Sequence, residues 1–280
     1  MIRAQIHSIR IFSCLLSLML MTSCALTPKE ITTSLENQRP IQDVPLEPEI
    51  RKFSQMISKS LEVSEQSEIS SNEDVEGWYL WSLAPNKKKT KYYLHHYHGK
   101  NVIHADAKSS ASGLIVPLKA KDIKEFDLQW TWKALKNIAL ADNTQGHVDD
   151  APLRIVLGFE GDKSSLPLKD QLAFDLAKLI SGHDLPYATL MYIWSEKSGM
   201  EEVITNKHIS RIKAIVVDSG AKDLGEWRTH RRSIEADFKK AYGENPGKLI
   251  AIGIMTDTDN TNEEVQAKYG DIEFQRRSNR

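Results

Sequence analysis

The sequence predicts a mostly β protein, a β-sandwich with two helical insertions. Short runs of aliphatic, β-branched and aromatic residues alternate with polar or Gly/Pro-containing turns, which is the pattern of a sandwich built from many strands. All 6 tryptophans lie between residues 78 and 227, in a stretch long enough for one domain with a sizeable core. The predicted strands cover residues 77–83, 91–98, 102–108, 128–134, 153–159, 188–194, 211–218 and 249–256.

Two stretches have helical rather than strand periodicity. Ile234, Phe238 and Tyr242 recur every four residues before Gly243, which suits the end of a helix. The other helix is expected to end at Gly182, and large aliphatic residues line one of its faces. That face contains Leu168, Leu172, Leu176, Leu179 and Ile180.

Alternation along the strands separates core positions from outer positions. Leu157 and Phe159 share one side of their strand, so Arg154 faces away from that core layer. Trp130 and Trp132 also share one face, and we interpret them as core residues in preference to an exposed platform for sugar stacking.

The N-terminal residues predict an exported lipoprotein. Arg3 and Arg10 give a positive start without an acidic residue before Glu30, and residues 11–21 form an apolar run too short to span a bilayer. The residues Leu-Met-Thr-Ser that precede Cys24 resemble the lipobox of bacterial lipoproteins. This resemblance implies that residues 1–23 are removed and that the Cys24 thiol carries a lipid. An ordinary signal peptide with a chance cysteine is the alternative.

The lipid would hold the protein at a membrane of the cell envelope. Ala25 follows the lipidated position, which by resemblance implies the outer membrane, with the domain facing the periplasm. The chain has 2 cysteines, and Cys14 would be removed with the signal. The mature protein is therefore expected to contain no disulfide and no cysteine nucleophile.

The chain is expected to consist of a signal peptide at 1–23, a lipidated tether at 24–72 and a sandwich domain at 73–280. The tether is rich in Ser, Glu, Gln, Thr and Pro, a composition that cannot bury enough apolar surface to fold by itself. The net charge is -1, from 37 basic and 38 acidic side chains, and gives no field that favours nucleic acid.

A set of motifs runs from about residue 77 to residue 274. They include Trp130-x-Trp132-Lys133, Asp149-Asp150, Leu153-Arg154-Ile155 and, as the most specific, Met255-Thr256-Asp257-Thr258-Asp259-Asn260-Thr261. Together they resemble the bacterial domain of unknown function 3047 family. The order of the motifs also resembles galactose-binding-like jelly rolls, the fold of many carbohydrate-binding modules. The resemblance implies an architecture and favours a glycan ligand, but this family is uncharacterised and implies no activity.

One group of polar residues is a candidate site for a glycan. Carboxylates and guanidinium groups form hydrogen bonds with sugar hydroxyls, and a tryptophan in a polar setting offers an exposed ring. A structural ion pair is the alternative, and it is the favoured interpretation for the aspartates and arginines. The candidate residues are Asp149, Asp150, Arg154, Arg211, Trp227 and Arg231.

A second group offers oxygen ligands of the kind that Ca²⁺ prefers. Asp257, Asp259 and Asn260 follow a predicted strand, and Asp271 comes a short loop later. The spacing is not that of an EF-hand, but the resemblance to carbohydrate modules implies a structural Ca²⁺ near the last strand. Turn chemistry, in which Asp and Asn side chains bond to the local backbone, is the favoured alternative.

Histidines form a third, weaker group. If residues 99–101 form a hairpin turn, His96 faces His104, and His98 and Asp106 share their side of the hairpin. Such a cluster suits Zn²⁺ or Cu²⁺, whereas a solvated hairpin face is the alternative.

No Ser-His-Asp arrangement, phosphate-binding glycine loop or metalloprotease helix is recognisable. The sequence therefore favours a non-catalytic envelope lipoprotein with a glycan-binding domain. An envelope scaffolding lipoprotein that binds a protein partner is the alternative, and a glycan-active hydrolase is less favoured.

Overall fold

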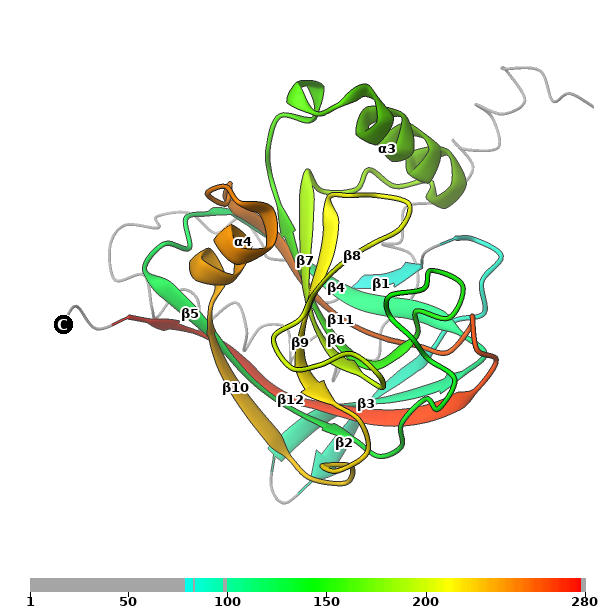
Figure 1. Ribbon diagram of the computed structural model, residues 1–280. Helices are drawn as coiled ribbons and strands as arrows, with labels where there is room; N and C mark the ends of the chain where they lie inside the picture. The colour runs from blue at the N-terminus through cyan, green and yellow to red at the C-terminus, as the bar shows by residue number, and fades with distance from the viewer. Residues whose placement is uncertain (1–78, 83, 98–99, 278–280) are drawn as a thin grey trace, which may run out of the picture. The chain divides into compact units, whose positions relative to one another are not determined.

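The computed structural model describes residues 79–82, 84–97 and 100–277, which form two β-sheets that pack face to face (Figure 1). The seven-stranded sheet has the order β1 (Tyr79–Ser82), β4 (Ala111–Lys121), β11 (Leu249–Asp257), β6 (Ala151–Phe159), β7 (Ala188–Ser195), β9 (Ile212–Ser219) and β8 (Val203–Thr205). The five-stranded sheet has the order β10 (Arg228–Ser233), β5 (Phe126–Ala134), β12 (Glu264–Arg276), β3 (Lys100–Lys108) and β2 (Lys91–Tyr97). The predicted signal peptide, Cys24 and the predicted tether lie outside the described residues.

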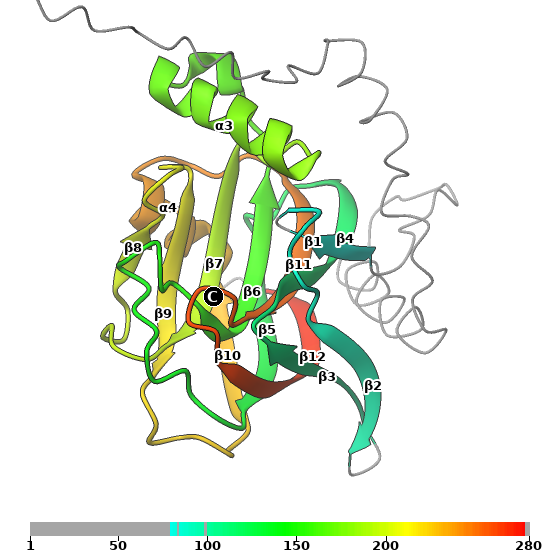
Figure 2. The same ribbon diagram turned by 90° about the vertical axis from the view of Figure 1, so that its right-hand side faces the viewer.

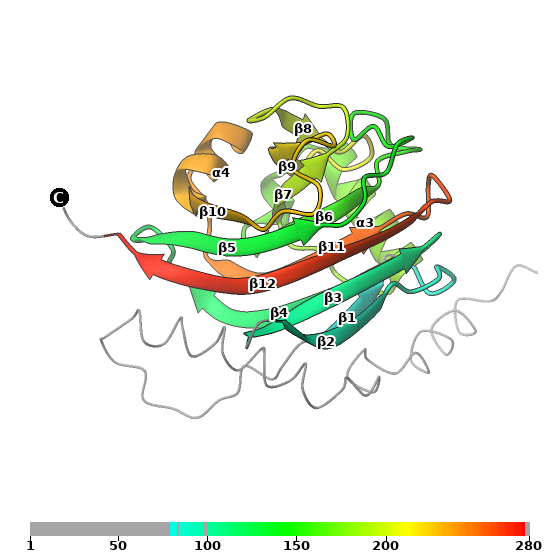
Figure 3. The ribbon, with the colours of Figure 1, turned by 90° about the horizontal axis from the view of Figure 1, so that it is seen from below.

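The chain passes repeatedly from one sheet to the other. β3 and β5 belong to the five-stranded sheet, whereas β4 and β6 belong to the seven-stranded sheet, and β10, β11 and β12 alternate in the same way. Figure 3 shows the two layers from below, with β12 in front of β11. Strand pairs in the described part of the chain are antiparallel except for β7 with β9. The described residues thus form a jelly-roll β-sandwich with two α-helices, as the sequence predicts.

The core lies between the two sheets. Trp130 and Trp132 from β5 are fully buried, and the Trp130 ring stacks on Tyr192 of β7 with 4.8 Å between ring centroids. Leu157 and Phe159 of β6 lie in the same core cluster. The inward positions predicted from strand alternation are thus confirmed, and Arg154 faces away from this core.

Strands that carry turn-forming or charged residues were not predicted. β4 contains Gly113 and Pro117, and β10 has the sequence Arg-Thr-His-Arg-Arg-Ser, which lacks any apolar alternation. Both are held in place by their neighbours, since β4 pairs with β11 and β10 pairs with β5. Tertiary pairing therefore decides these segments rather than local propensity.

The helix α3 (Leu168–Ser181) ends at Gly182, whose φ of 77° is the left-handed conformation expected of a helix stop. Its packed face is made of small residues and one ring: Ala173, Phe174 and Ala177 lie against Ile209. The face of large aliphatic residues points to solvent instead, with exposed fractions of 56–69%. We call this the α3 stripe: Leu168, Leu172, Leu176, Leu179 and Ile180. Figure 2 shows α3 beside one end of the seven-stranded sheet.

The helix α4 (Ile234–Tyr242) begins after Ser233, whose side chain accepts a hydrogen bond from the backbone N–H of Ala236, and ends at Gly243. Ile234 and Phe238 are fully buried, as their spacing predicts. Among the described residues, neither this helix nor any other combines the length and apolar character needed to cross a membrane.

The hairpin of β2 and β3 has a different register from the predicted one. Tyr93 pairs with His104, and His96 pairs with Asn101. His96 therefore does not face His104, so this pairing does not form the predicted cluster around Asp106. His98, the remaining member of that cluster, lies outside the described residues. The Tyr93 ring stacks on His104 instead, with 4.7 Å between centroids.

Candidate functional site

A pocket of about 710 Å³ lies on the outer face of the seven-stranded sheet. Its floor consists of outward-facing residues of four neighbouring strands, among them Ile115, Val156 and Met191. Trp81 of β1 lines it, as does the connection from α3 to β7, residues 183–187. The size is in the usual range for small-molecule sites.

Two glycines allow the connection between α3 and β7 to lie close to the sheet. A Cβ atom at Gly158 would stand 2.8 Å from Cγ of Pro186, and one at Gly161 would stand 2.3 Å from the Tyr187 ring. Neither position can carry a side chain unless the connection between α3 and β7 moves away from the sheet. The sequence of β6 and its following turn therefore shapes one side of the pocket.

Arg154 and Asp257 form a buried ion pair at the polar end of the pocket. Nε of Arg154 donates to Oδ1 of Asp257 at 2.8 Å, and one terminal nitrogen donates to Oδ2 at 3.0 Å. The two side chains are 7% and 5% exposed. The guanidinium also donates to the backbone carbonyl of Asp149, so the pair fastens β6, β11 and the loop before β6 together.

The adjacent aspartates 149 and 150 have different partners. Asp150 is buried, and its Oδ2 accepts hydrogen bonds of 2.7 Å from both the backbone N–H and the hydroxyl of Thr261. Asp149 lines the pocket, and its Oδ1 accepts a 2.7 Å hydrogen bond from the Asn260 amide. Asp150 therefore fixes the loop after β11, whereas Asp149 and Asn260 are placed to meet a ligand.

Asp259 adds a second ion pair to the polar end of the pocket, together with a carboxylate oxygen that accepts no hydrogen bond from the described residues. Its Oδ2 pairs with Nζ of Lys87, and its side chain is only 7% exposed. Its Oδ1 is buried and accepts no hydrogen bond from the described residues. A buried carboxylate oxygen without a donor costs free energy, so this atom is suited to a donor that a ligand supplies.

Burial raises the pKa of two carboxyl groups at this end. For Asp257, desolvation outweighs the opposing effect of Arg154 and raises the pKa to about 7. For Asp149, desolvation also raises the pKa, against the attraction of Arg154. The polar end therefore holds carboxyl groups whose charged forms are destabilised.

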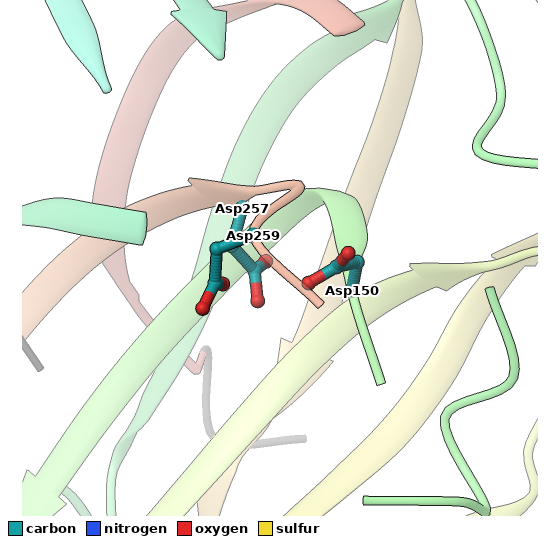
Figure 4. A group of neighbouring side chains, drawn as sticks. All are labelled: Asp150, Asp257 and Asp259. Atoms are coloured by element: carbon teal, nitrogen blue, oxygen red, sulfur yellow. The ribbon is translucent and has the colours of Figure 1, made fainter. Parts of the chain in front are cut away.

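Asp150, Asp257 and Asp259 lie close enough to share an ion, since one oxygen from each lies within 4.8 Å of the others (Figure 4). Arg154 and Lys87 already neutralise two of these carboxylates, and Thr261 donates twice to the third. Oxygen ligands suit Ca²⁺, but the charged groups of Arg154 and Lys87 compete with it for the carboxylates. The donor set fits a neutral hydroxyl better than a divalent cation.

The family of the chain follows from comparison with known proteins. The model of a family described as a protein of unknown function, DUF3047, matches residues 76–273. The chain belongs to this family. The match includes both aspartate motifs and Arg154, so the family region contains the polar end of the pocket. A comparison with curated proteins gave no match.

Two of the solved structures with some similarity have names that refer to carbohydrates. The family 11 carbohydrate-binding module of the cellulase Lic26A-Cel5E of Clostridium thermocellum is 8% identical, with a TM-score of 0.36, over 77% of this chain and 95% of that one. The xyloglucanase domain of NopAA from Sinorhizobium fredii, in complex with cellobiose, is 6% identical, with a TM-score of 0.38, over 72% and 94%. The assignment of the present chain as a jelly roll rests on its own strand order.

The structure merges two groups that the sequence separates. Asp149, Asp150 and Arg154 were predicted as ligand-binding residues, and Asp257 and Asp259 as metal ligands, yet all five meet at one end of the pocket with Asn260. β6 and β11 are neighbours in the sheet although about a hundred residues separate them. Asp271 lies on β12 in the other sheet and is not among the three clustered aspartates.

The remaining predicted ligand residues lie elsewhere. Arg211 is held between the Tyr187 and Tyr242 rings and donates to Glu244 at 2.5 Å. Arg231 is on β10 and pairs with Asp127 at 2.9 Å. Trp227 is half-buried and lies near Gly270 of β12, in contrast to the exposed ring expected from its polar neighbours. These three residues do not line the pocket.

Sequence reasoning missed several residues that line the pocket. Trp81 comes from a short edge strand, Lys87 from a turn and Tyr187 from the connection between α3 and β7, and none of the three was predicted as a site residue. The outward-facing positions of Gly158 and Val156 were available from strand alternation. The closeness of these residues to β1 and to the α3 connection was not available from the sequence.

Proposed function

We propose that the protein is a lipid-anchored protein of the cell envelope whose jelly roll binds a glycan in the pocket on the outer face of the seven-stranded sheet. The N-terminal lipobox resemblance around Cys24 supports the location, and Ala25 supports the outer membrane. The observation that carries the binding proposal is the buried Oδ1 of Asp259, which accepts no hydrogen bond within the described chain.

The chemistry of the polar end suits hydroxyl groups. Asp149 and Asp259 supply acceptors, and Lys87 and Asn260 supply donors, so a hydroxyl that both donates and accepts finds partners of each kind. The charges are already paired with each other, which favours a neutral ligand over an ion. Trp81, which lines the same pocket, offers a ring against which the apolar face of a sugar packs.

Residues 25–280 of the chain, probed on a glycan array, test this proposal, since they contain both sheets and the whole described core. The variant Asp259→Asn keeps the shape but weakens the acceptor, so we expect at least about a tenfold loss of affinity. Asp122→Asn is the matched control because Asp122 is exposed and pairs only with Lys124 in the described structure. Binding to no glycan, or equal binding by Asp259→Asn, would overturn the proposal.

A scaffolding function is favoured by a separate observation, the α3 stripe. Exposed apolar patches on soluble proteins often mark sites of protein association. A photo-crosslinker in place of Leu176 should then give one defined protein adduct in cells, and an adduct should be absent with the crosslinker at Glu226, an exposed residue outside the stripe. Equal labelling from both positions would count against this alternative.

A hydrolase remains the third candidate because Asp149 and Asp257 line the pocket with raised pKa values. It predicts that bound oligosaccharides gain reducing ends over time and that Asp149→Asn abolishes this release. Intact oligosaccharides after prolonged incubation would exclude it for those substrates.

A further inference from the structure

The floor of the pocket has two chemically different parts. Asp149, Arg154, Asp257 and Asp259 gather at one end, whereas the floor beyond them is apolar; the charged residues Glu160, Lys163 and Asp184 also line the pocket. The strand pairing places Gly253 opposite Val156 and Ala251 opposite Gly158, so small residues form the middle of the floor. Ile115 and Met191 lie on the flanking strands in the same row as Gly253 and Val156.

The apolar floor is long enough for an extended chain. Arg154 and Gly158 are four residues apart on β6, which corresponds to roughly 13 Å along the strand. Pro186 packs against Gly158 at the far end, and Leu185 lines the pocket beside it. The pocket therefore continues from the polar end as an apolar lane.

A purely saccharide ligand fits only part of this pocket. Sugar hydroxyls that lay over Val156, Gly253 and Ala251 would lose water without finding donors or acceptors in these side chains, which is costly. An aliphatic chain gains free energy from the same contact. The buried acceptor on Asp259 still requires a donor at the other end.

We infer that the ligand is an amphiphile of the glycolipid class, with a hydroxylated head group at Asp149 and Asp259 and an aliphatic chain over Val156, Gly253 and Met191. This inference rests on the proposed function for the head group and extends it to the rest of the pocket. The chain lies along β6 and ends against Pro186, which packs on Gly158.

Calorimetric titration of residues 25–280 with methyl, butyl, hexyl and octyl β-D-glucosides, all below their micelle concentrations, tests the inference. Affinity should rise about two- to fourfold for each added methylene. Displacement of the uncharged apolar dye N-phenyl-1-naphthylamine by the same series reads out the apolar lane independently of the head group.

The double variant Val156→Thr with Met191→Gln makes the floor polar at nearly constant volume. It should remove the dependence on chain length while the melting temperature confirms that the protein is folded. Leu172→Gln with Leu176→Gln is the matched control, because these exposed residues belong to the α3 stripe and do not line the pocket. A chain-length effect lost in this control would place the chain on α3 and overturn the inference.

The outcomes separate this inference from the proposed function. Glycans that bind on the array without any gain from an alkyl chain, and without dye displacement, overturn the inference and leave glycan binding intact. Chain-dependent binding that the floor variant removes, together with an array without binders, supports the apolar lane and overturns the glycan proposal.

Discussion

Arg154 on β6 and Asp257 on β11 join two neighbouring strands through two hydrogen bonds, and both side chains are more than nine-tenths buried. Such a pair is costly to bury, but removal of one partner costs more, because the other charge then remains in the interior unpaired. The pair lies at the polar end of the pocket, so it links the stability of the sandwich to the shape of the site.

Arg154→Ala is expected to lower the free energy of unfolding by about 3–5 kcal/mol. Urea denaturation followed by tryptophan fluorescence measures this loss. The double variant Arg154→Met with Asp257→Leu removes both charges and should recover much of it. A loss below about 1 kcal/mol for Arg154→Ala would mean that the pair contributes no more than a surface ion pair.

The raised pKa of Asp257 predicts a dependence of stability on pH. The folded protein binds this proton more tightly than the unfolded chain does, because the pKa is about 7 when folded and near 3.8 otherwise. The stabilisation is therefore complete below about pH 4 and is lost as pH rises through about 7. Asp257→Asn should flatten the fall in unfolding free energy between about pH 4 and pH 7. An unchanged slope in this variant would assign the effect to other groups.

The two apolar faces of α3 should differ sharply in mutational cost. Phe174→Ala removes a buried ring and is expected to cost about 3–5 kcal/mol. Leu172→Ala and Leu176→Ala alter the α3 stripe, and each should change the free energy of unfolding by less than about 0.5 kcal/mol. Thermal and urea unfolding of the three variants decides between these values. A large loss for Leu172→Ala would show that the stripe is covered in the folded chain.

A chelator should leave the melting temperature unchanged, because Arg154 and Lys87 already balance the clustered aspartates. Differential scanning calorimetry with EDTA, and with added Ca²⁺, measures this. A rise in melting temperature with Ca²⁺ that disappears in Asp259→Asn would instead identify a cation site, since a metal bound only by the folded state stabilises it.

Local pattern in the sequence was sufficient for many of the strands, the two helices and the burial of Trp130 and Trp132, but not for β4, β8, β10 and β12. It was insufficient for the orientation of α3. The large leucines give this helix its clearest apolar face, yet Ala173 and Phe174 form the face that packs against the domain. It was also insufficient for register, because the β2–β3 hairpin is displaced from the predicted pairing of His96 with His104. The site combines residues 149–154 with 257–260, and only the non-local pairing of β6 and β11 brings them together.

The last two strands occupy the interior of both sheets. β11 pairs with β4 and β6, and β12 pairs with β3 and β5, so neither sheet is continuous until the final thirty or so residues have been added. A nascent chain that lacks them has the edges of each sheet without its centre. We therefore expect both sheets to become complete only when β11 and β12 are available to pair.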